Sequence, residues 1–374
     1  MQNENKLNKV ISFNEWIILS SNLSSTVKDP KKIDIQELKK TYKINESLQK
    51  LDEDLIGLNS VKTRIKEITA ILFMDKVRQD FGLSKYYPGL HMSFTGSPGT
   101  GKSTIASRMA ELLQNLGYLT RGHLVVASRD DLVAQFVGQT APKTKDVLEK
   151  SMGGVLLIDE AYYLYKPNNE KDYGGEAIEM LLQVMENKRT DLVLIFAGYS
   201  EPMKVFYRSN PGLSSRVAHH IDFPDYTRNE LLTIAKKLFE ERQYKMSFYA
   251  EEVFLKYLDL RRQLPLFANA RSIKNIVNRA CFRLASRLMG QTDTFTYKSL
   301  ISITPYDLIL STLFLKGLKI FPMTKIGYNQ KESVNQKTIY QVFDTDKIEF
   351  AGKEKNITGS TRVFSLYIWK NFVE

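Results

Sequence analysis

The sequence predicts an α/β domain built around a parallel sheet, followed by a smaller all-helical domain. Between residues 90 and 198, short apolar stretches of strand length alternate with amphipathic stretches of helical length. This alternation is typical of a parallel sheet that is covered by helices on both faces. After Thr227 the strand-like stretches stop, and helical periodicity continues alone to about residue 315.

Two helical stretches precede the sheet, because apolar residues recur with helical spacing in Ile33–Gln49 and in Val61–Phe81. In the second stretch, the residues expected to share one apolar face are Val61, Ile65, Ile68, Ile71, Leu72 and Met74. The predicted strands are Leu90–Phe94, Leu124–Ala127, Val155–Ile158 and Leu192–Phe196. The predicted helices among them are one that follows the turn Gly96–Gly101 and runs through Gln114, then Asp130–Phe136, Thr144–Lys150 and Gly175–Asn187.

Four segments follow from this reading. Residues 1–32 are polar and weakly ordered, and they are either a divergent organelle-targeting segment or a floppy N-terminus. Residues 33–226 form the α/β domain with its N-terminal helices, and residues 227–315 form the helical domain. Its expected helices are Glu230–Arg242, Ala250–Gln263, Arg271–Met289 and Thr304–Leu315. Residues 316–374 are Lys-rich, lean towards β structure and have no assigned fold.

Composition and charge narrow the class of protein. The apolar fraction of 43% is that of an ordinary globular protein, and no apolar run approaches the roughly 18 residues of a membrane-spanning helix. The formal charge of +11 is spread along the chain, without a run of five basic residues. Such a charge is compatible with nucleic acid, with an acidic protein partner or with no particular partner, and nucleic acid is the less favoured.

The strongest motif lies between the first predicted strand and the helix after it. The residues Gly96, Ser97, Pro98, Gly99, Thr100, Gly101, Lys102 and Ser103 fit the P-loop pattern G-x-x-x-x-G-K-[ST]. The glycines let backbone N–H groups turn towards phosphates, and the helix N-terminus adds its positive end. We expect Lys102 to reach the terminal phosphates of ATP and the Ser103 hydroxyl to coordinate Mg²⁺.

Two acids follow the third predicted strand. Asp159 and Glu160 come directly after Val155–Ile158, at the edge of a parallel sheet where ligands bind. We expect Asp159 to hold Mg²⁺ and Glu160 to polarise the attacking water, which is the second acid that an ATPase needs. The next strand leads to Tyr199, which would orient that water or would be a half-buried aromatic at a strand end.

Two arginines are candidates for the stabilisation of phosphate charge across a subunit interface. Arg216 follows a turn just before a strand-like segment, which suits an arginine finger acting on a neighbouring subunit, and Arg208 is a second candidate. Arg271 begins a helix of the second domain and is expected to reach back to the γ-phosphate. The finger role requires an oligomer.

A possible gripping loop lies between two predicted helices. Phe136, Val137 and Gly138 combine an aromatic, an aliphatic and a flexible residue, which could contact an unfolded peptide without sequence preference. The alternative is a helix-end aromatic packed in the core.

Long stretches of the chain resemble the CbbX/CfxQ family, the red-type Rubisco activases. The resemblance runs from about residue 33 to about residue 315. It is carried by LDEDLIGL (51–58), LHMSFTGSPGTGKS (90–103), RDDLVAQFVGQTAPKTK (129–145), GGVLLIDEAYYLY (153–165), EAIEMLLQVMEN (176–187), SNPGLSSRVAHHIDFPDY (209–226) and FANARSIKNIVNRA (267–280).

The resemblance implies an AAA+ P-loop domain, in which a parallel sheet lies between helices, followed by a small helical lid domain. It implies a ring, expected to be a hexamer, whose client is the large subunit of Rubisco inhibited by sugar phosphates. Ribulose 1,5-bisphosphate is implied as an allosteric ligand beside ATP and Mg²⁺. Ile56 and Gly57 are implied as part of the adenine pocket, Arg216 as the finger and Arg271 as a second sensor. The pore aromatic of the family is usually tyrosine, whereas this chain has Phe136.

The sequence leaves rivals open. One rival keeps the ATPase and changes the client to another protein, and a second is a nucleic-acid remodeller such as a clamp loader. A third is a ring subunit without hydrolysis, which the presence of all hydrolytic residue types disfavours. Lys-, Asn- and Ile-rich composition together with the resemblance favours the plastid stroma, with a bacterial cytoplasm as the alternative.

Overall fold

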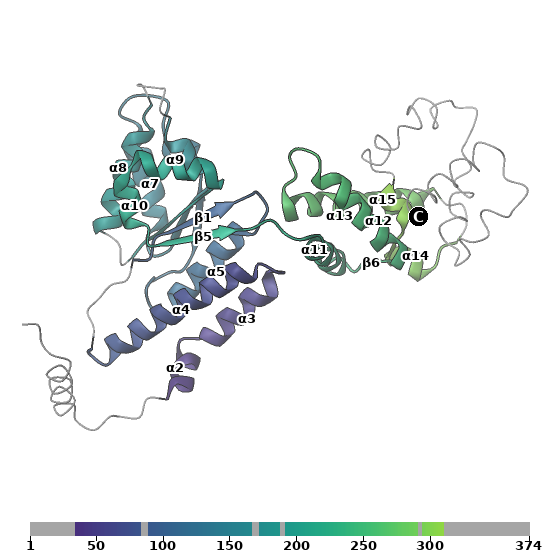
Figure 1. Ribbon diagram of the computed structural model, residues 1–374, viewed down its shortest axis with the longest axis horizontal. Helices are drawn as coiled ribbons and strands as arrows, with labels where there is room; N and C mark the ends of the chain where they lie inside the picture. Colours follow the sequence, from purple (N-terminus) through teal and green to yellow (C-terminus); the bar gives the residue numbers. More distant parts are fainter. Residues whose placement is uncertain (1–33, 84–88, 167–171, 188–190, 291–293, 310–374) are drawn as a thin grey trace, which may run out of the picture. The chain divides into compact units, whose positions relative to one another are not determined.

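The computed structural model describes residues 34–83, 89–166, 172–187, 191–290 and 294–309 (Figure 1). The expected N-terminal segment 1–32 and the extension 316–374 lie outside these residues. The chain divides into two compact units, residues 1–45 and residues 46–374, and each is described by itself. The first contains helix α2 (Ile35–Thr41), whose N-cap Asp34 accepts hydrogen bonds from the first-turn backbone amides.

A five-stranded parallel sheet forms the centre of the second unit. Its strands are β1 (Met92–Gly96), β2 (Leu124–Ala127), β3 (Val155–Ile158), β4 (Val193–Gly198) and β5 (His219–Phe223), in the order β2-β3-β4-β1-β5. The first strand in sequence therefore lies between the last two, with Met92 opposite Ile195 on one side and His219 on the other. Every residue of β3 and β4 is buried, which explains their uninterrupted apolar runs.

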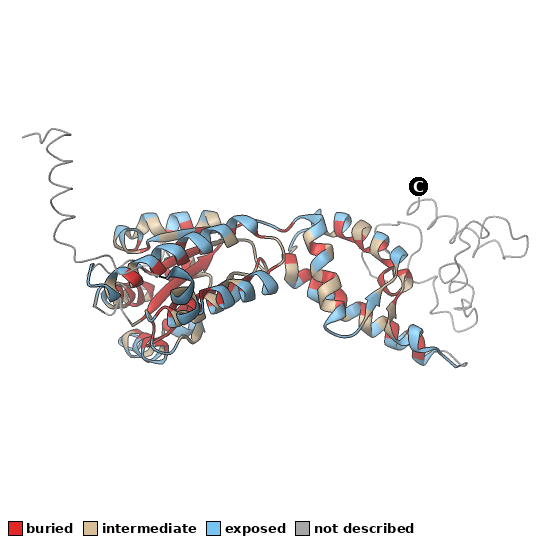
Figure 2. Cartoon of the chain, turned by 90° about the horizontal axis from the view of Figure 1, so that it is seen from below, coloured by how far each residue is buried: buried red, intermediate tan, exposed pale blue. Residues whose placement is uncertain are grey.

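Helices cover both faces of this sheet. Helices α4 (Asn59–Asp80) and α5 (Lys102–Asn115) lie on one face in Figure 1. The other face carries a second set, and Figure 2 shows the buried strands between the two layers. That set comprises α6 (Arg129–Leu132), α7 (Thr140–Ser151), the short 3₁₀ helix η1 (Ala161–Leu164), α8 (Gly174–Asn187), α9 (Ser200–Ser209) and α10 (Pro211–Arg216).

The N-terminal helices differ from the sequence prediction in two respects. The single helix expected over Ile33–Gln49 is two helices, because Lys43 takes the left-handed conformation and the chain restarts as α3 (Ile44–Asp54). In α4, Ile71 and Met74 are exposed at 55% and 48%, so their expected place on the apolar face is wrong. The buried face of α4 consists of Val61, Ile65, Ile68, Thr69, Leu72, Phe73 and Val77.

The described residues from 228 to 309 form the predicted helical domain. Its helices are α11 (Arg228–Glu240), α12 (Phe248–Arg262), α13 (Asn269–Met289), α14 (Tyr297–Ile301) and α15 (Pro305–Ile309). Helix α11 begins with a capping box in which Thr227 and Glu230 bond each other's backbone amides. The sequence did not predict the small ladder of β6 (Lys245–Met246) with β7 (Ser302–Ile303). The helix predicted over Thr304–Leu315 is described only to Ile309.

No helix among the described residues combines the length and the apolar character that crossing a membrane requires.

Candidate functional site

The candidate site lies where the parallel strands end. The loop after β1, the two acids after β3 and Tyr199 after β4 all follow the carboxyl ends of neighbouring strands. Because parallel strands end at one edge of the sheet, residues that are far apart in sequence meet there. An open pocket of about 530 Å³ at this edge is lined by Gly96 and Ser97 from the loop and by Tyr199.

The P-loop conformation depends on three glycines. Gly96, Gly99 and Gly101 have φ values of 142°, 72° and 97°, which side-chain-bearing residues rarely adopt. The loop also passes very close to other backbone: a Cβ on Gly96 would lie 2.3 Å from the Phe223 carbonyl oxygen, and one on Gly99 would lie 2.3 Å from the Ala268 carbonyl oxygen. Gly96 and Gly99 therefore admit glycine alone, as the predicted phosphate-binding loop requires.

Lys102 is the first residue of α5 and folds back along the loop. Its Nζ donates hydrogen bonds of 2.8 Å to the carbonyl oxygens of Gly96 and Ser97. Burial lowers the pKa of its ammonium group, whereas the carboxylates of Asp159 and Glu160 act in the opposite direction. A partly buried cation with two acids in electrostatic reach fits the binding of a Mg²⁺-bound polyphosphate.

The two acids are held in different ways at the end of β3. The backbone N–H of Asp159 donates to the Ala127 carbonyl oxygen at 2.8 Å, which extends the ladder with β2 by one residue. Glu160 takes the left-handed conformation, with φ 51° and ψ 46°, and one of its carboxylate oxygens is buried without a hydrogen-bond partner among the described residues. Strained backbone and an unpaired carboxylate are typical of functional positions.

The residues around the acids fit Mg²⁺ as well as phosphate. Ser103 lies in the first turn of α5 with its side chain exposed, one residue after Lys102. A hydroxyl and a carboxylate are the hard oxygen ligands that Mg²⁺ takes, together with substrate phosphates. Ser103 and Asp159 would hold the ion, as the sequence predicts.

Tyrosines line the site beside Glu160. Tyr199 is the N-cap of α9 and is 41% exposed, and its ring centroid lies 6.4 Å from that of Tyr162. Burial raises the pKa of the Tyr199 hydroxyl, and the charge of Glu160 adds to this. Tyr162 packs against Gly198, where a Cβ would approach its ring within 2.8 Å. Tyr199 is therefore placed near Glu160, and Tyr162 is a neighbour that the sequence did not single out.

The start of α13 contacts the P-loop. The backbone N–H of Ala270 donates to the Gly99 carbonyl oxygen at 3.1 Å, and Arg271 in the same turn is exposed. Asn269, which is 1% exposed, donates to Asp225 at 2.8 Å and accepts from the Tyr226 backbone N–H at 3.2 Å. The sequence predicted Arg271 and missed Asn269. The sequence signal that could have found Asn269 is its place as a polar residue at the start of the helix, two residues before Arg271.

The segment that precedes α4 also lies on the P-loop. A Cβ on Gly101 would lie 3.2 Å from Leu55 and 3.7 Å from Leu58. Gly57, between them, has φ 62°, and a Cβ there would collide with the side chain of Glu230. The predicted adenine contacts Ile56 and Gly57 therefore belong to a segment that packs directly on the loop.

Arg216 and the exposed loop lie apart from this cluster. Arg216 ends α10, where it donates to the Gly212 carbonyl oxygen and pairs with Glu186 of α8, both at 3.0 Å. Arg208 is exposed on α9 and has no ion-pair partner among the residues that the structure describes. Phe136 and Val137 are 67% and 78% exposed between α6 and α7, so the core-packing alternative is wrong; Gly138 follows with φ 75°.

Comparison with known proteins gives consistent matches over the described fold. Residues 92–225 match the ATPase family associated with various cellular activities (AAA), and residues 227–313 match the AAA lid domain. A CfxQ homolog from Guillardia theta is 58% identical over 285 residues, which are 76% of this chain and 97% of that relative.

Another similar protein is named a chloroplastic ribulose bisphosphate carboxylase/oxygenase activase, from Cyanidioschyzon merolae. It is 56% identical over 283 residues, which are 75% of this chain and 97% of that relative. Among solved structures, the RuvB Holliday junction branch migration motor of Thermotoga maritima matches with a TM-score of 0.45 and 18% identity, over 86% of each chain.

Proposed function

Because this chain belongs to the CfxQ/CbxX family of AAA ATPases, we propose that it is an ATP-driven motor that remodels inhibited red-type Rubisco and releases the sugar phosphates bound there. Membership of the AAA family makes the chain an ATP-hydrolysing enzyme. The observation that supports the client is the likeness to a named Rubisco activase, which extends over nearly the whole of that relative.

The hydrolytic part of the proposal uses side chains of one chain. The P-loop amides and Lys102 would bind the β- and γ-phosphates, and Ser103 and Asp159 would hold Mg²⁺. When bound, the ion would neutralise the charge that develops on the transferred phosphoryl group. Glu160 would accept a proton from the attacking water, and its unpaired carboxylate oxygen is available for that bond. Tyr199 would orient the water.

The catalytic centre would be completed by a neighbouring subunit in a ring. Arg216 bonds α8 and its own helix, not the P-loop of its own chain. With 34% of its side chain exposed, its ion pair with Glu186 contributes little to stability and can exchange for a phosphate contact. Arg208 is the second candidate for this role. Arg271, in the turn that contacts the P-loop, would report hydrolysis to the lid.

Force would reach the client through the exposed loop. Phe136 and Val137 present an aromatic ring and an aliphatic side chain to solvent, which grip peptides through apolar contact irrespective of sequence. The loop would pull on the C-terminal tail of the Rubisco large subunit from the centre of a hexameric ring. We also propose the plastid stroma as the location and ribulose 1,5-bisphosphate as an allosteric ligand.

Recovery of carboxylase activity tests the proposed function. Red-type Rubisco is first inhibited with a tightly bound sugar bisphosphate and then incubated with this protein. We expect carboxylation to recover with ATP and not with ADP or a non-hydrolysable analogue. If the protein hydrolyses ATP but leaves Rubisco inhibited, with and without ribulose bisphosphate, the client is a different protein.

A further inference from the structure

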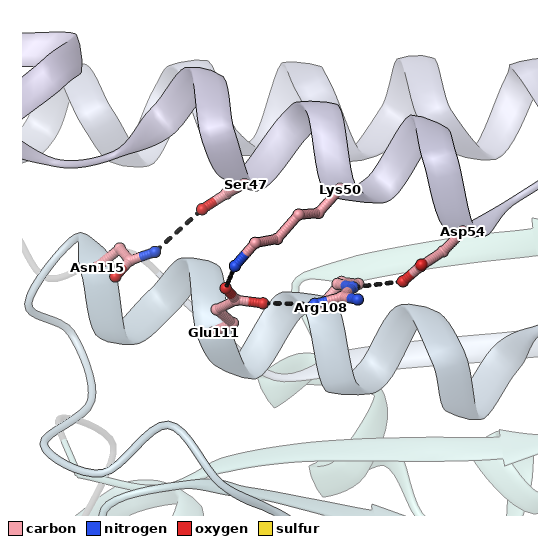
Figure 3. Close-up of polar contacts among 6 residues, drawn as sticks. All are labelled: Ser47, Lys50, Asp54, Arg108, Glu111 and Asn115. Carbon is pink, nitrogen blue, oxygen red and sulfur yellow. Dashed lines mark hydrogen bonds and ion pairs between the residues drawn. The ribbon is translucent and has the colours of Figure 1, made fainter.

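A row of polar contacts joins α3 to α5, the helix that begins with the P-loop lysine (Figure 3). The residues of this row, here called the α3–α5 ladder, are Ser47, Lys50 and Asp54 of α3 and Arg108, Glu111 and Asn115 of α5. The Asn115 amide donates to the Ser47 hydroxyl at 3.0 Å, and Lys50 pairs with Glu111. Every one of these contacts lies within the second compact unit.

Arg108 is the centre of the ladder. Its Nε donates to Asp54 of α3 at 2.5 Å, and its Nη1 donates to Glu111 of α5 at 2.7 Å. One guanidinium group therefore holds one carboxylate from each helix. The side chains of Arg108 and Asp54 are 29% and 33% exposed. An arginine that is partly shielded from solvent and bonds two carboxylates fixes the relative positions of its partners more firmly than a single exposed ion pair does.

The last pair of the ladder adjoins the segment that packs on the P-loop. Helix α3 ends at Asp54, and Leu55 follows directly, 4% exposed and against Gly101. Leu58, also 4% exposed, contacts the same glycine and has φ 52°. Leu58 thus takes the left-handed conformation directly after Gly57, and this conformation is disfavoured for leucine, so the surrounding packing must hold it.

We propose that Arg108 and Asp54 are positioning residues for the nucleotide, which fix residues 55–58 over the P-loop. They touch neither ATP nor the acids, and they act through the segment that contains Ile56 and Gly57. The proposal rests on the proposed ATPase function and on the adenine contact that the family resemblance predicts for these two residues. When the ladder is intact, residues 55–58 already have the conformation that contacts adenine before the nucleotide binds. The free energy of binding is then not reduced by the entropy lost in ordering them.

The test measures nucleotide affinity in the full-length chain. Asp54→Asn keeps the shape of the side chain and removes its charge, and Arg108→Gln removes the bridge. We expect the Kd for a fluorescent ADP analogue and the KM for ATP to rise roughly threefold to tenfold in each variant, with kcat within about twofold of wild type. ADP is included because it carries the adenine ring and lacks the γ-phosphate, so its affinity reports on the adenine contact. The double variant should bind the nucleotide no more weakly than the weaker of the two single variants, because both substitutions break the same contact between Arg108 and Asp54.

A matched ion pair elsewhere separates positioning from general stability. Lys236 of α11 and Glu251 of α12 also join two helices, at 2.7 Å and with 40% and 30% of their side chains exposed. Glu251→Gln should lower the Tm about as much as Asp54→Asn and leave the Kd and the KM unchanged.

Two results would overturn the inference: an unchanged Kd in both ladder variants, or an equal loss of affinity in Glu251→Gln. Asp54→Asn keeps the test decisive if Arg108→Gln does not fold, because it replaces only one oxygen of a partly exposed side chain by an NH2 group. A wild-type protein that binds no ADP would instead refute the ATP site on which the proposed function depends.

Discussion

Glu160 combines a strained backbone with an unpaired carboxylate oxygen at the position predicted for the general base. It follows a fully buried strand, takes left-handed backbone angles and keeps one carboxylate oxygen unpaired. A backbone in this region is disfavoured for glutamate, so the surrounding packing must hold it there. Tyr162 and Tyr199 supply part of that packing. The carboxylate lies within electrostatic reach of Lys102, which the sequence predicts to bind the terminal phosphates of ATP.

The division of the catalytic residues between neighbouring chains can be tested by mixing two inactive variants. We expect Glu160→Gln alone to lose at least about a hundredfold in ATPase rate, because the general base is gone. Arg216→Ala alone should lose about a thousandfold while binding ATP normally. Mixed assemblies should recover activity, since an Arg216→Ala subunit keeps its acids and its neighbour can supply the missing arginine.

The mixing experiment has a matched control in Arg208→Ala. If Arg216 is the finger, this variant hydrolyses ATP at a rate near that of wild type and gains nothing from mixing. If mixing with Glu160→Gln restored ATPase activity to Arg208→Ala and not to Arg216→Ala, Arg208 would be the arginine finger in place of Arg216.

His91 predicts a pH dependence of folding stability. It is 4% exposed, accepts a hydrogen bond from the Leu194 backbone N–H at 3.0 Å, and burial lowers its pKa to about 4. As the pH falls from about 6.5 to 4, the unfolded chain binds a proton that the folded chain does not, so stability decreases over this range and levels off below it.

The size of this effect is about 3 kcal/mol, from roughly 1.4 kcal/mol per pKa unit. Chemical denaturation at several pH values should show that the wild type loses this much more free energy of unfolding than His91→Asn between pH 6.5 and 4. Parallel curves for the two proteins would show that His91 does not titrate as described.

The helices and strands show what a sequence reveals and what it does not. The fold class predicted from the sequence is confirmed. The motifs at the strand ends were predictable because each is a continuous stretch of sequence: a glycine pattern, or an apolar run followed by two acids. Contacts between residues that are distant in the sequence were not predictable: Asp54 meets Arg108 54 residues later, and Asn269 meets Asp225 44 residues earlier.

Periodicity also does not decide which apolar residues a helix buries. Helix α4 has more apolar residues than one face accommodates, and its packing left Ile71 and Met74 exposed while it buried Thr69. A buried threonine fits there because its hydroxyl donates to the Ile65 carbonyl oxygen at 2.7 Å within the same helix. The assignment of roles to the site residues stays a prediction.

The loop between α6 and α7 carries a prediction about force transmission. Phe136→Ala removes an exposed ring that packs nothing in the core, so ATPase activity should stay within about twofold of wild type. Reactivation of inhibited Rubisco should fall to the background rate. Phe282→Ala on α13, where the ring is 72% exposed, is the control and should reactivate normally. Full reactivation by Phe136→Ala would exclude a gripping role for this loop.

The whole chain combines an ATPase domain, a lid domain and further sequence of its own. The Guillardia theta relative aligns with 76% of this chain and 97% of itself, so about a quarter of the chain lies outside the alignment. The P-loop, the two acids and the candidate arginines fall inside the matched residues 92–225 and 227–313, whereas Ile56 and Gly57 precede them. Residues 316–374 lie outside both family matches, and the proposal gives them no part in hydrolysis.

The most direct test of the account follows the inhibitor itself. Red-type Rubisco is loaded with a radiolabelled sugar bisphosphate, and release of the label is measured against ATP consumed by the wild-type protein and by Glu160→Gln. We predict release that rises with ATP turnover in the wild type and is absent in Glu160→Gln, although this variant still binds ATP. Equal release by the two proteins, or ATP consumption without any release, would contradict the claim that ATP hydrolysis at this site drives the remodelling of Rubisco.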